Sequence, residues 1–155
     1  MILPFQHRRD GVHLGLAEHE RELLRDLVAQ LVSLLETHDD ADPAVARLYP
    51  PGYDGDAEAD AEFRRLTADD LTAGKIENAK ALLASLHADR RAPLTHETLE
   101  AWLRSLTDLR LTLASRLGVT NEGVPDPGDR NGVVLRDVYE WLGYVQESLV
   151  RAIDR

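Results

Sequence analysis

The chain has 155 residues and no cysteine. This absence excludes disulfide bonds, thiolate nucleophiles and zinc centres built on thiolates. Long apolar runs are also missing: no segment approaches the ~20 apolar residues that span a bilayer. The first residues, MILPFQHRRDGVH, contain no apolar stretch typical of a signal peptide. We therefore expect a cytoplasmic protein.

Positive charge is scarce in this sequence. Lysine and arginine together number 18 against 28 aspartates and glutamates, for a formal net charge of -10. This balance argues against direct binding to DNA or RNA, whose phosphates attract basic surfaces. The acids are concentrated in residues 36–70, which hold eleven acids and three arginines. The middle of the chain is therefore expected to carry an acidic surface.

Motifs of several chemistries are absent or incomplete. The sequence has neither of the glycine-rich patterns that bind nucleotide phosphates. Asp54, Asp56 and Glu58 resemble the first ligands of a calcium loop, but glycine is absent from its sixth position and glutamate from its twelfth. His96 begins HETLE, which lacks the second histidine of a zinc-protease helix. We predict no catalytic residue, no cofactor and no metal ligand.

The length favours a single domain over residues 1–155. Residues 1–16 are predicted to form a β-hairpin because Asp10 and Gly11 are a strong two-residue turn signal. That turn would pair Phe5 with Leu16. One face of the hairpin would then carry the apolar residues Phe5, Val12, Leu14 and Leu16. A lone hairpin is marginal in water, so this face should pack on the helices or on another subunit.

Residues 17–155 are expected to form a helical bundle, since apolar residues recur at three- and four-residue spacing. Thr95 is a predicted N-cap, and Gly118 a predicted helix end. Thr67 and Asp70 fit a capping box that would divide one helical stretch in two. The predicted helices cover about 17–37, 56–65, 68–86, 95–117 and 133–153, with a short turn at 43–48. The fold class is therefore mainly α, a bundle of about five helices with an N-terminal β-hairpin.

Two helical positions suggest contacts beyond the core. Leu111 falls in line with Arg104 and Asp108 on the predicted polar side of its helix, where the core does not need a leucine. Gly143 lies within a helix, at a cost of ~1 kcal/mol relative to alanine. A single exposed leucine is common in proteins and explains Leu111 equally well. Gly143 suggests close approach by another group, and sequence drift explains this glycine as well.

Four segments of the chain resemble the AosR family of actinobacteria in order and spacing. They are RLYPPGY, EFRRLTADDL, WLRSLTDLRLTLASRLGV and YEWLGYVQESLVRAI. The resemblance extends over the chain from Leu14 onward and implies a non-enzymatic, regulatory protein-interaction domain. The family's characterised member regulates the response to oxidative stress, binds an alternative sigma factor and raises expression of a cysteine-synthesis pathway. Family genes also lie beside that of a protease adaptor, so a proteolysis component is a second possible partner.

The resemblance gives the segment RLYPPGYDGDAEADAEFRRL, residues 47–66, an expected role. Leu48, Tyr49 and Tyr53 are interpreted as anchors that hold the loop onto the bundle. The acids beyond them are expected to form an outward face towards a basic partner. These acids are Asp54, Asp56, Glu58, Asp60 and Glu62. Leu111 is a further candidate for this partner face, and a solvated helix start is the alternative interpretation of the acids.

Two other hypotheses remain open at this point. The chain is alternatively a small helical enzyme or ligand-binding protein with a pocket between helices, or it forms a homodimer. A deep pocket lined by converging polar groups would favour the enzyme, whereas a flat apolar and acidic patch with no pocket would favour the interaction protein.

The family's regulator senses oxidation through a cysteine pair that this chain lacks. Peroxide or diamide should therefore leave the mass, electrophoretic mobility and partner affinity of this protein unchanged at doses that spare methionine. Mass spectrometry with a binding assay on treated and untreated protein checks this. An oxidation-dependent gain in binding with Met1 unmodified would contradict it.

Overall fold

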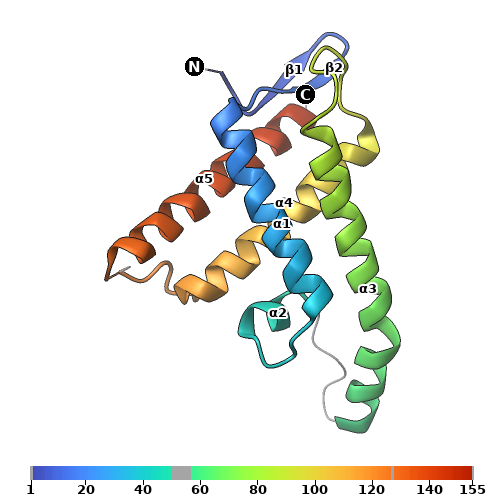
Figure 1. Ribbon diagram of the computed structural model, residues 1–155, viewed down its shortest axis with the longest axis vertical. Coiled ribbons are helices and arrows are strands. Elements are labelled where there is room, and N and C mark those ends of the chain that lie inside the picture. The colour runs from blue at the N-terminus through green and yellow to red at the C-terminus, as the bar shows by residue number, and fades with distance from the viewer. Residues whose placement is uncertain (1, 50–56, 127, 155) are drawn as a thin grey trace.

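The computed structural model describes residues 2–49, 57–126 and 128–154 (Figure 1). These residues form a two-stranded hairpin followed by five helices. The elements are β1 (Phe5–Arg8), β2 (Gly11–Leu14), α1 (Glu18–Thr37), α2 (Pro43–Arg47), α3 (Ala57–Ser85), α4 (His96–Leu117) and α5 (Arg130–Ile153). The predicted fold class, a mainly helical bundle with an N-terminal β-hairpin, is confirmed. None of the helices in the described ranges has the length and apolarity needed to cross a membrane.

The predicted ends of α4 agree with the structure, and a capping residue marks each of them. The Thr95 hydroxyl accepts a hydrogen bond from the Thr98 amide at 3.2 Å and starts α4. Gly118 ends that helix in the left-handed conformation, with φ of 75°. By contrast, α5 begins at Arg130 instead of Val133, because the Asp129 carboxylate caps it by accepting from the Gly132 amide at 2.7 Å.

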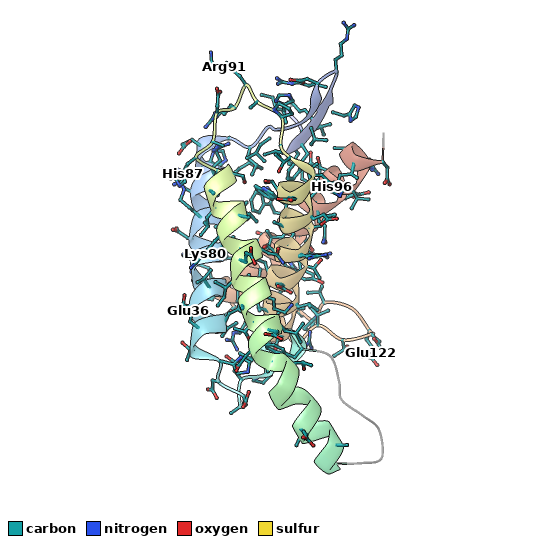
Figure 2. All side chains as sticks on the ribbon, turned by 90° about the vertical axis from the view of Figure 1, so that its right-hand side faces the viewer. Glu36, Lys80, His87, Arg91, His96 and Glu122 are labelled. Carbon is teal, nitrogen blue, oxygen red and sulfur yellow. The ribbon has the colours of Figure 1, made fainter. Side chains whose placement is uncertain are left out.

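The predicted break at Thr67 is wrong, since α3 is one continuous helix from Ala57 to Ser85. A capping box forms at the start of a helix, where the N-cap residue has a non-helical backbone. Residues 57–73 contain no glycine or proline that would interrupt the helix before such a start. The second half of α3 packs beside α1 and α4 (Figure 2). Its first half projects beyond the other helices (Figure 1).

The register of the hairpin differs from the prediction by two residues. Phe5 pairs with Leu14 instead of Leu16, and the two-residue turn is Arg9–Asp10. Side chains alternate with a period of two along a strand, so this shift leaves every residue on its predicted face. Gly11 belongs to the strand, with φ of 137°, and a Cβ there would lie 2.9 Å from the Pro93 side chain.

Both outer edges of the hairpin are covered by other parts of the chain. The Leu94 amide donates to the Val12 carbonyl at 2.8 Å, and the Phe5 amide donates to the Ser148 hydroxyl at 3.1 Å. The Phe5 ring meets Trp102 edge-on, with ring centroids 5.1 Å apart. The apolar face of the hairpin therefore packs on the helices of its own chain, one of the two predicted arrangements.

The opposite face of the hairpin is also buried in part. His13 lies on this face, as its alternation predicts, yet only 2% of it is exposed. Its Nε2 lies 2.7 Å from Asp10 Oδ1, and its Nδ1 lies 3.4 Å from the Arg90 carbonyl oxygen. The connection between α3 and α4 therefore covers a face that the sequence alone would place in solvent.

Replacing Phe5 by alanine should lower the free energy of unfolding by about 3–5 kcal/mol, because the side chain is fully buried against Trp102. Leu3→Ala is the matched control, since half of Leu3 is exposed in the same N-terminal segment. Urea unfolding of the three proteins checks this. A loss of less than about 1 kcal/mol in Phe5→Ala would show that the hairpin does not depend on this contact.

Candidate functional site

Part of the predicted acidic face belongs to the projecting half of α3. Glu62 is exposed there, as are Asp69 and Asp70 further along the same helix. Glu58 and Asp60 also belong to α3. Three of the predicted residues lie outside the described part of the chain: Tyr53, Asp54 and Asp56.

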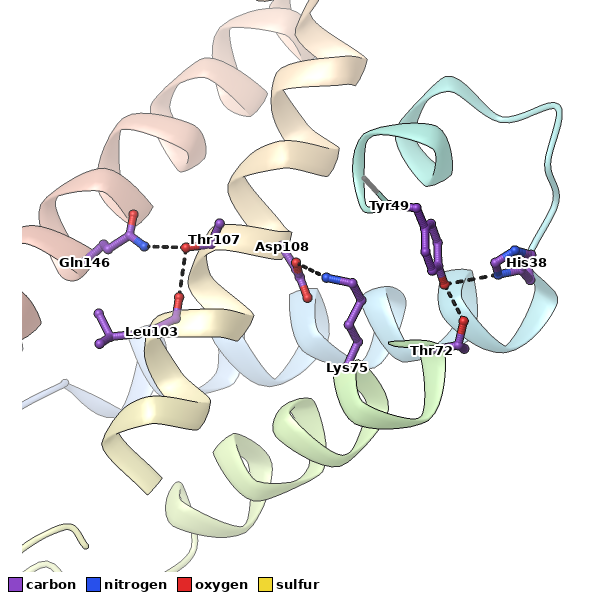
Figure 3. Close-up of polar contacts among 8 residues, drawn as sticks. All are labelled: His38, Tyr49, Thr72, Lys75, Leu103, Thr107, Asp108 and Gln146. Carbon is purple, nitrogen blue, oxygen red and sulfur yellow. Dashed lines mark hydrogen bonds and ion pairs between the residues drawn. The ribbon is translucent and has the colours of Figure 1, made fainter. Parts of the chain in front are cut away.

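The predicted loop anchors Leu48 and Tyr49 lie against the bundle. Leu48 is 5% exposed. The Tyr49 hydroxyl contacts His38 Nδ1 at 3.1 Å and the Thr72 hydroxyl, and its ring packs edge-on against His38 (Figure 3). Burial raises the pKa of Tyr49, which keeps the phenol neutral. Tyr49 thus joins the end of α2 to the last turn of α1 and to α3.

Next to this cluster, a buried ion pair joins α3 to α4. Lys75 Nζ lies 2.9 Å from Asp108 Oδ1 (Figure 3). The Asp108 carboxyl group is almost fully buried, and this burial raises its pKa against the opposing effects of the Lys75 hydrogen bond and charge. The prediction that Asp108 lies on a solvated stripe of α4 is therefore wrong.

Leu111 lies one turn beyond Asp108 on α4. It is half-buried and packs against the core, so it is not the exposed leucine that its position in the sequence indicates. In this part of α4 the predicted polar stripe is only partly covered: Asp108 is buried and Leu111 half-buried, whereas Arg104 is exposed.

An open groove runs between α3 and α4 beside the ion pair. Leu71 and Leu103 supply its apolar surface, and Leu71 is 36% exposed. Lys75 and Asp108 lie at its base. The full lining comprises Asp70, Leu71, Gly74, Lys75, Asn78, Leu103, Arg104, Thr107 and Asp108. An open groove with apolar walls and charged margins can hold a peptide segment of another protein.

Gly143 of α5 is explained by a contact within the chain. A Cβ on Gly143 would lie 3.2 Å from the Arg110 guanidinium, which passes over that part of α5. Arg110 stacks on Tyr139 at 4.9 Å and donates to Gln146 at 3.2 Å. The close approach predicted at Gly143 is therefore confirmed, and the approaching group is a side chain of α4.

The described residues contain few other candidates for a catalytic or metal-binding site. Within these ranges, no group of three or more histidine and acidic side chains is placed to hold a metal ion. A smaller depression between the hairpin and α5 contains His7, whose Nδ1 lies 3.1 Å from the Ala152 carbonyl oxygen. Sequence reasoning missed Lys75 and Thr72 in the α3–α4 region, because their partners are distant in the chain. Gly74, a glycine inside a predicted helix, was a feature of the sequence that could have drawn attention to this region.

The fold and this surface define a hairpin-capped helical bundle with an open groove between two helices. By sequence, the chain belongs to the family described as Domain of unknown function (DUF2017), which it matches over residues 2–153. No solved structure matches it.

Two named relatives support the resemblance found in the sequence. The oxidative stress regulator AosR of Mycobacterium tuberculosis (strain ATCC 25618 / H37Rv) is 28% identical over 181 residues, which cover 92% of this chain and 83% of the relative. The putative oxidative stress regulator AosR of Mycobacterium leprae (strain TN) is 29% identical over 175 residues, covering 89% and 80%. These names support a regulatory role for the family.

The raised pKa of Asp108 has a testable consequence for stability. A carboxyl group whose pKa is higher in the folded than in the unfolded state adds stability at low pH, and this contribution is lost as the pH rises through the folded-state pKa. Asp108→Asn removes this titration. The stability of the natural chain relative to Asp108→Asn should therefore increase as the pH falls from 7 to about 4.

Asp89→Asn is the matched control, because hydrogen bonds from Arg91 lower the pKa of Asp89. The stability of the natural chain relative to this variant should decrease over the same fall in pH. Urea unfolding at several pH values measures both differences. Parallel pH profiles for the two variants would contradict the assignment of Asp108 as a buried carboxyl group with a raised pKa.

Proposed function

We propose that this chain is a non-enzymatic regulatory protein of the actinobacterial cytoplasm that acts by binding a basic protein. The proposed partner is an alternative sigma factor, with a component of the proteolysis machinery as the second candidate. The regulatory role has the support of the relatives' names. The observation that carries the mode of action is the exposed acidic first half of α3, which projects beyond the bundle (Figure 1).

Among the described residues, some acids are held by basic side chains, whereas exposed acids of this half, like Glu22 and Asp26 of α1, are not. What distinguishes this half is that it projects beyond the other helices (Figure 1). Asp42 is held by Arg116 through two contacts of 2.8 Å, and Asp108 is held by Lys75. By contrast, Glu62 and Asp69 form no ion pair with any residue that the structure describes. Carboxylates left in solvent on a projecting helix attract a basic surface over a distance of about 8–10 Å at physiological salt. Such charges chiefly raise the rate of association.

The geometry favours binding over catalysis as the function. The α3–α4 groove is open to solvent, and its charged pair, Lys75 and Asp108, is already engaged within the chain. A catalytic site needs polar groups that converge on a substrate and exclude water. An apolar groove with polar and charged residues at its margins instead resembles a protein interface, in which a polar rim surrounds an apolar core.

The acidic half of α3 can be tested by charge reversal. Glu62 and Asp69 are both exposed and lie two helical turns apart on one side of α3. The double variant Glu62→Lys, Asp69→Lys should lower the association rate with an alternative sigma factor on the order of 10-fold at low salt and weaken its salt dependence. Dissociation should change less. Surface plasmon resonance at low and physiological salt measures both rates.

The control reverses the same number of charges at two exposed acids of α1, Glu22→Lys and Asp26→Lys, which lie one helical turn apart. This control should retain the association rate of the natural chain to within about twofold, apart from the small effect of net charge. Equal association rates for both double variants at both salt concentrations would refute the steering role of α3. Absence of binding by the natural chain would refute the sigma factor as partner.

A further inference from the structure

No contact among the described residues explains why position 74 is a glycine. It lies in the middle of α3, where glycine costs ~1 kcal/mol relative to alanine. A Cβ at this position would meet no atom within 4 Å, so the surrounding structure leaves room for a side chain. Its φ is not positive, so the helix does not need glycine for its backbone either. Gly143 differs, because the Arg110 guanidinium occupies the space there.

The position of Gly74 suggests what the absence of a side chain there allows. Gly74 lines the α3–α4 groove together with Leu71 and Leu103. Leu71 is among the large apolar residues that remain exposed, and Leu103 is half-buried. Without a Cβ at Gly74, another backbone can approach the groove more closely than it could above any other residue. The groove therefore combines an apolar surface with a point of close access.

The charges beside the groove indicate the chemistry of its occupant. Asp70 lines the α3 side of the groove one helical turn before Gly74, and Glu77 lies one turn after Gly74, just outside the lining; both are exposed. On the α4 side the exposed Arg104 adds one positive charge to the lining. Asp70 also adjoins the acidic first half of α3. The ammonium group of Lys75 is engaged by Asp108, so it does not favour a small anion. A second copy of this chain, with its net charge of -10, would be repelled by the same acids.

We propose that the α3–α4 groove docks an amphipathic helix of a basic partner protein. An apolar side chain of that helix enters between Leu71 and Leu103, its backbone crosses at Gly74, and its lysines or arginines lie beside Asp70 and Glu77. This is the helix-in-groove mode of recognition, in which apolar anchors at helical spacing provide the affinity. The proposal rests on the proposed function for the basic character of the partner.

The probe is a synthetic amphipathic helical peptide with leucines on one face and lysines on the other. Two comparison peptides carry glutamate in place of lysine, or serine in place of leucine. Binding to the full chain is measured by fluorescence anisotropy of the labelled peptide, and its location by NMR shifts of backbone amides. The leucine–lysine peptide should bind, with the largest shifts at Leu71, Gly74, Leu103 and Thr107, and both comparison peptides should bind at least ~10-fold more weakly.

The discriminating variants place the same side chain on neighbouring positions of α3. Gly74→Leu fills the groove and should weaken binding of the leucine–lysine peptide by at least ~10-fold. Ala73→Leu adds a leucine at the adjacent exposed position, outside the groove lining, and should leave binding unchanged. Gly74→Ala should raise the thermal midpoint, because nothing in the chain opposes its Cβ. The thermal midpoint of Gly74→Leu, measured in the same way, shows whether a loss of binding in that variant is a loss of fold.

Several results would overturn the proposal. They are equal binding by Gly74→Leu and the natural chain, equal binding of the glutamate peptide, shifts centred away from the groove, and no binding. Self-association of the chain that Gly74→Leu abolishes, seen by sedimentation, would assign the groove to a second copy instead. The proposed function fails separately: charge reversal at Glu62 and Asp69 would then leave sigma-factor association unchanged, whatever the groove binds.

Discussion

The arrangement of this bundle depends on the burial of Trp102. The side chain is fully buried, and its Nε1 donates to the Ser85 hydroxyl at 2.8 Å, which in turn donates to the Leu82 carbonyl at 2.6 Å. Its ring meets Phe5 of the hairpin. One residue of α4 thus holds both the last turn of α3 and β1. An indole needs a hydrogen-bond partner when it is buried, so these elements have one favourable relative position.

A second contact fixes α3 against α4 further along both helices. Lys75 and Asp108 form this contact within a region that is largely shielded from water. Two fixed points on antiparallel helices determine which residues face each other between and beside them. Gly74 and Leu71 therefore face α4 at the level of Leu103 and Thr107, and an open groove results. Burying the Asp108 carboxyl group costs free energy. The contact that requires this burial also helps to hold the groove in shape.

The proposed regulatory role follows from how α3 is divided between core and solvent. Its second half carries buried residues such as Ala79 and Leu82, whereas its first half displays exposed acids beyond the bundle. A continuous helix transmits the rigidity of the packed half to the projecting half, so the acids are presented in a defined direction. Without cysteine, this presentation cannot be switched by thiol oxidation.

The sequence by itself determined which segments are helical, because apolar spacing and capping residues such as Thr95 and Gly118 act locally. It also determined the apolar face of the hairpin, although the register was off by two, since alternation is insensitive to such a shift. Only the tertiary structure decided the burial of His13 and the pairing of Lys75 with Asp108. These features depend on what covers a residue. A side chain 33 positions away, as in the Lys75–Asp108 pair, leaves no periodic signal in the sequence.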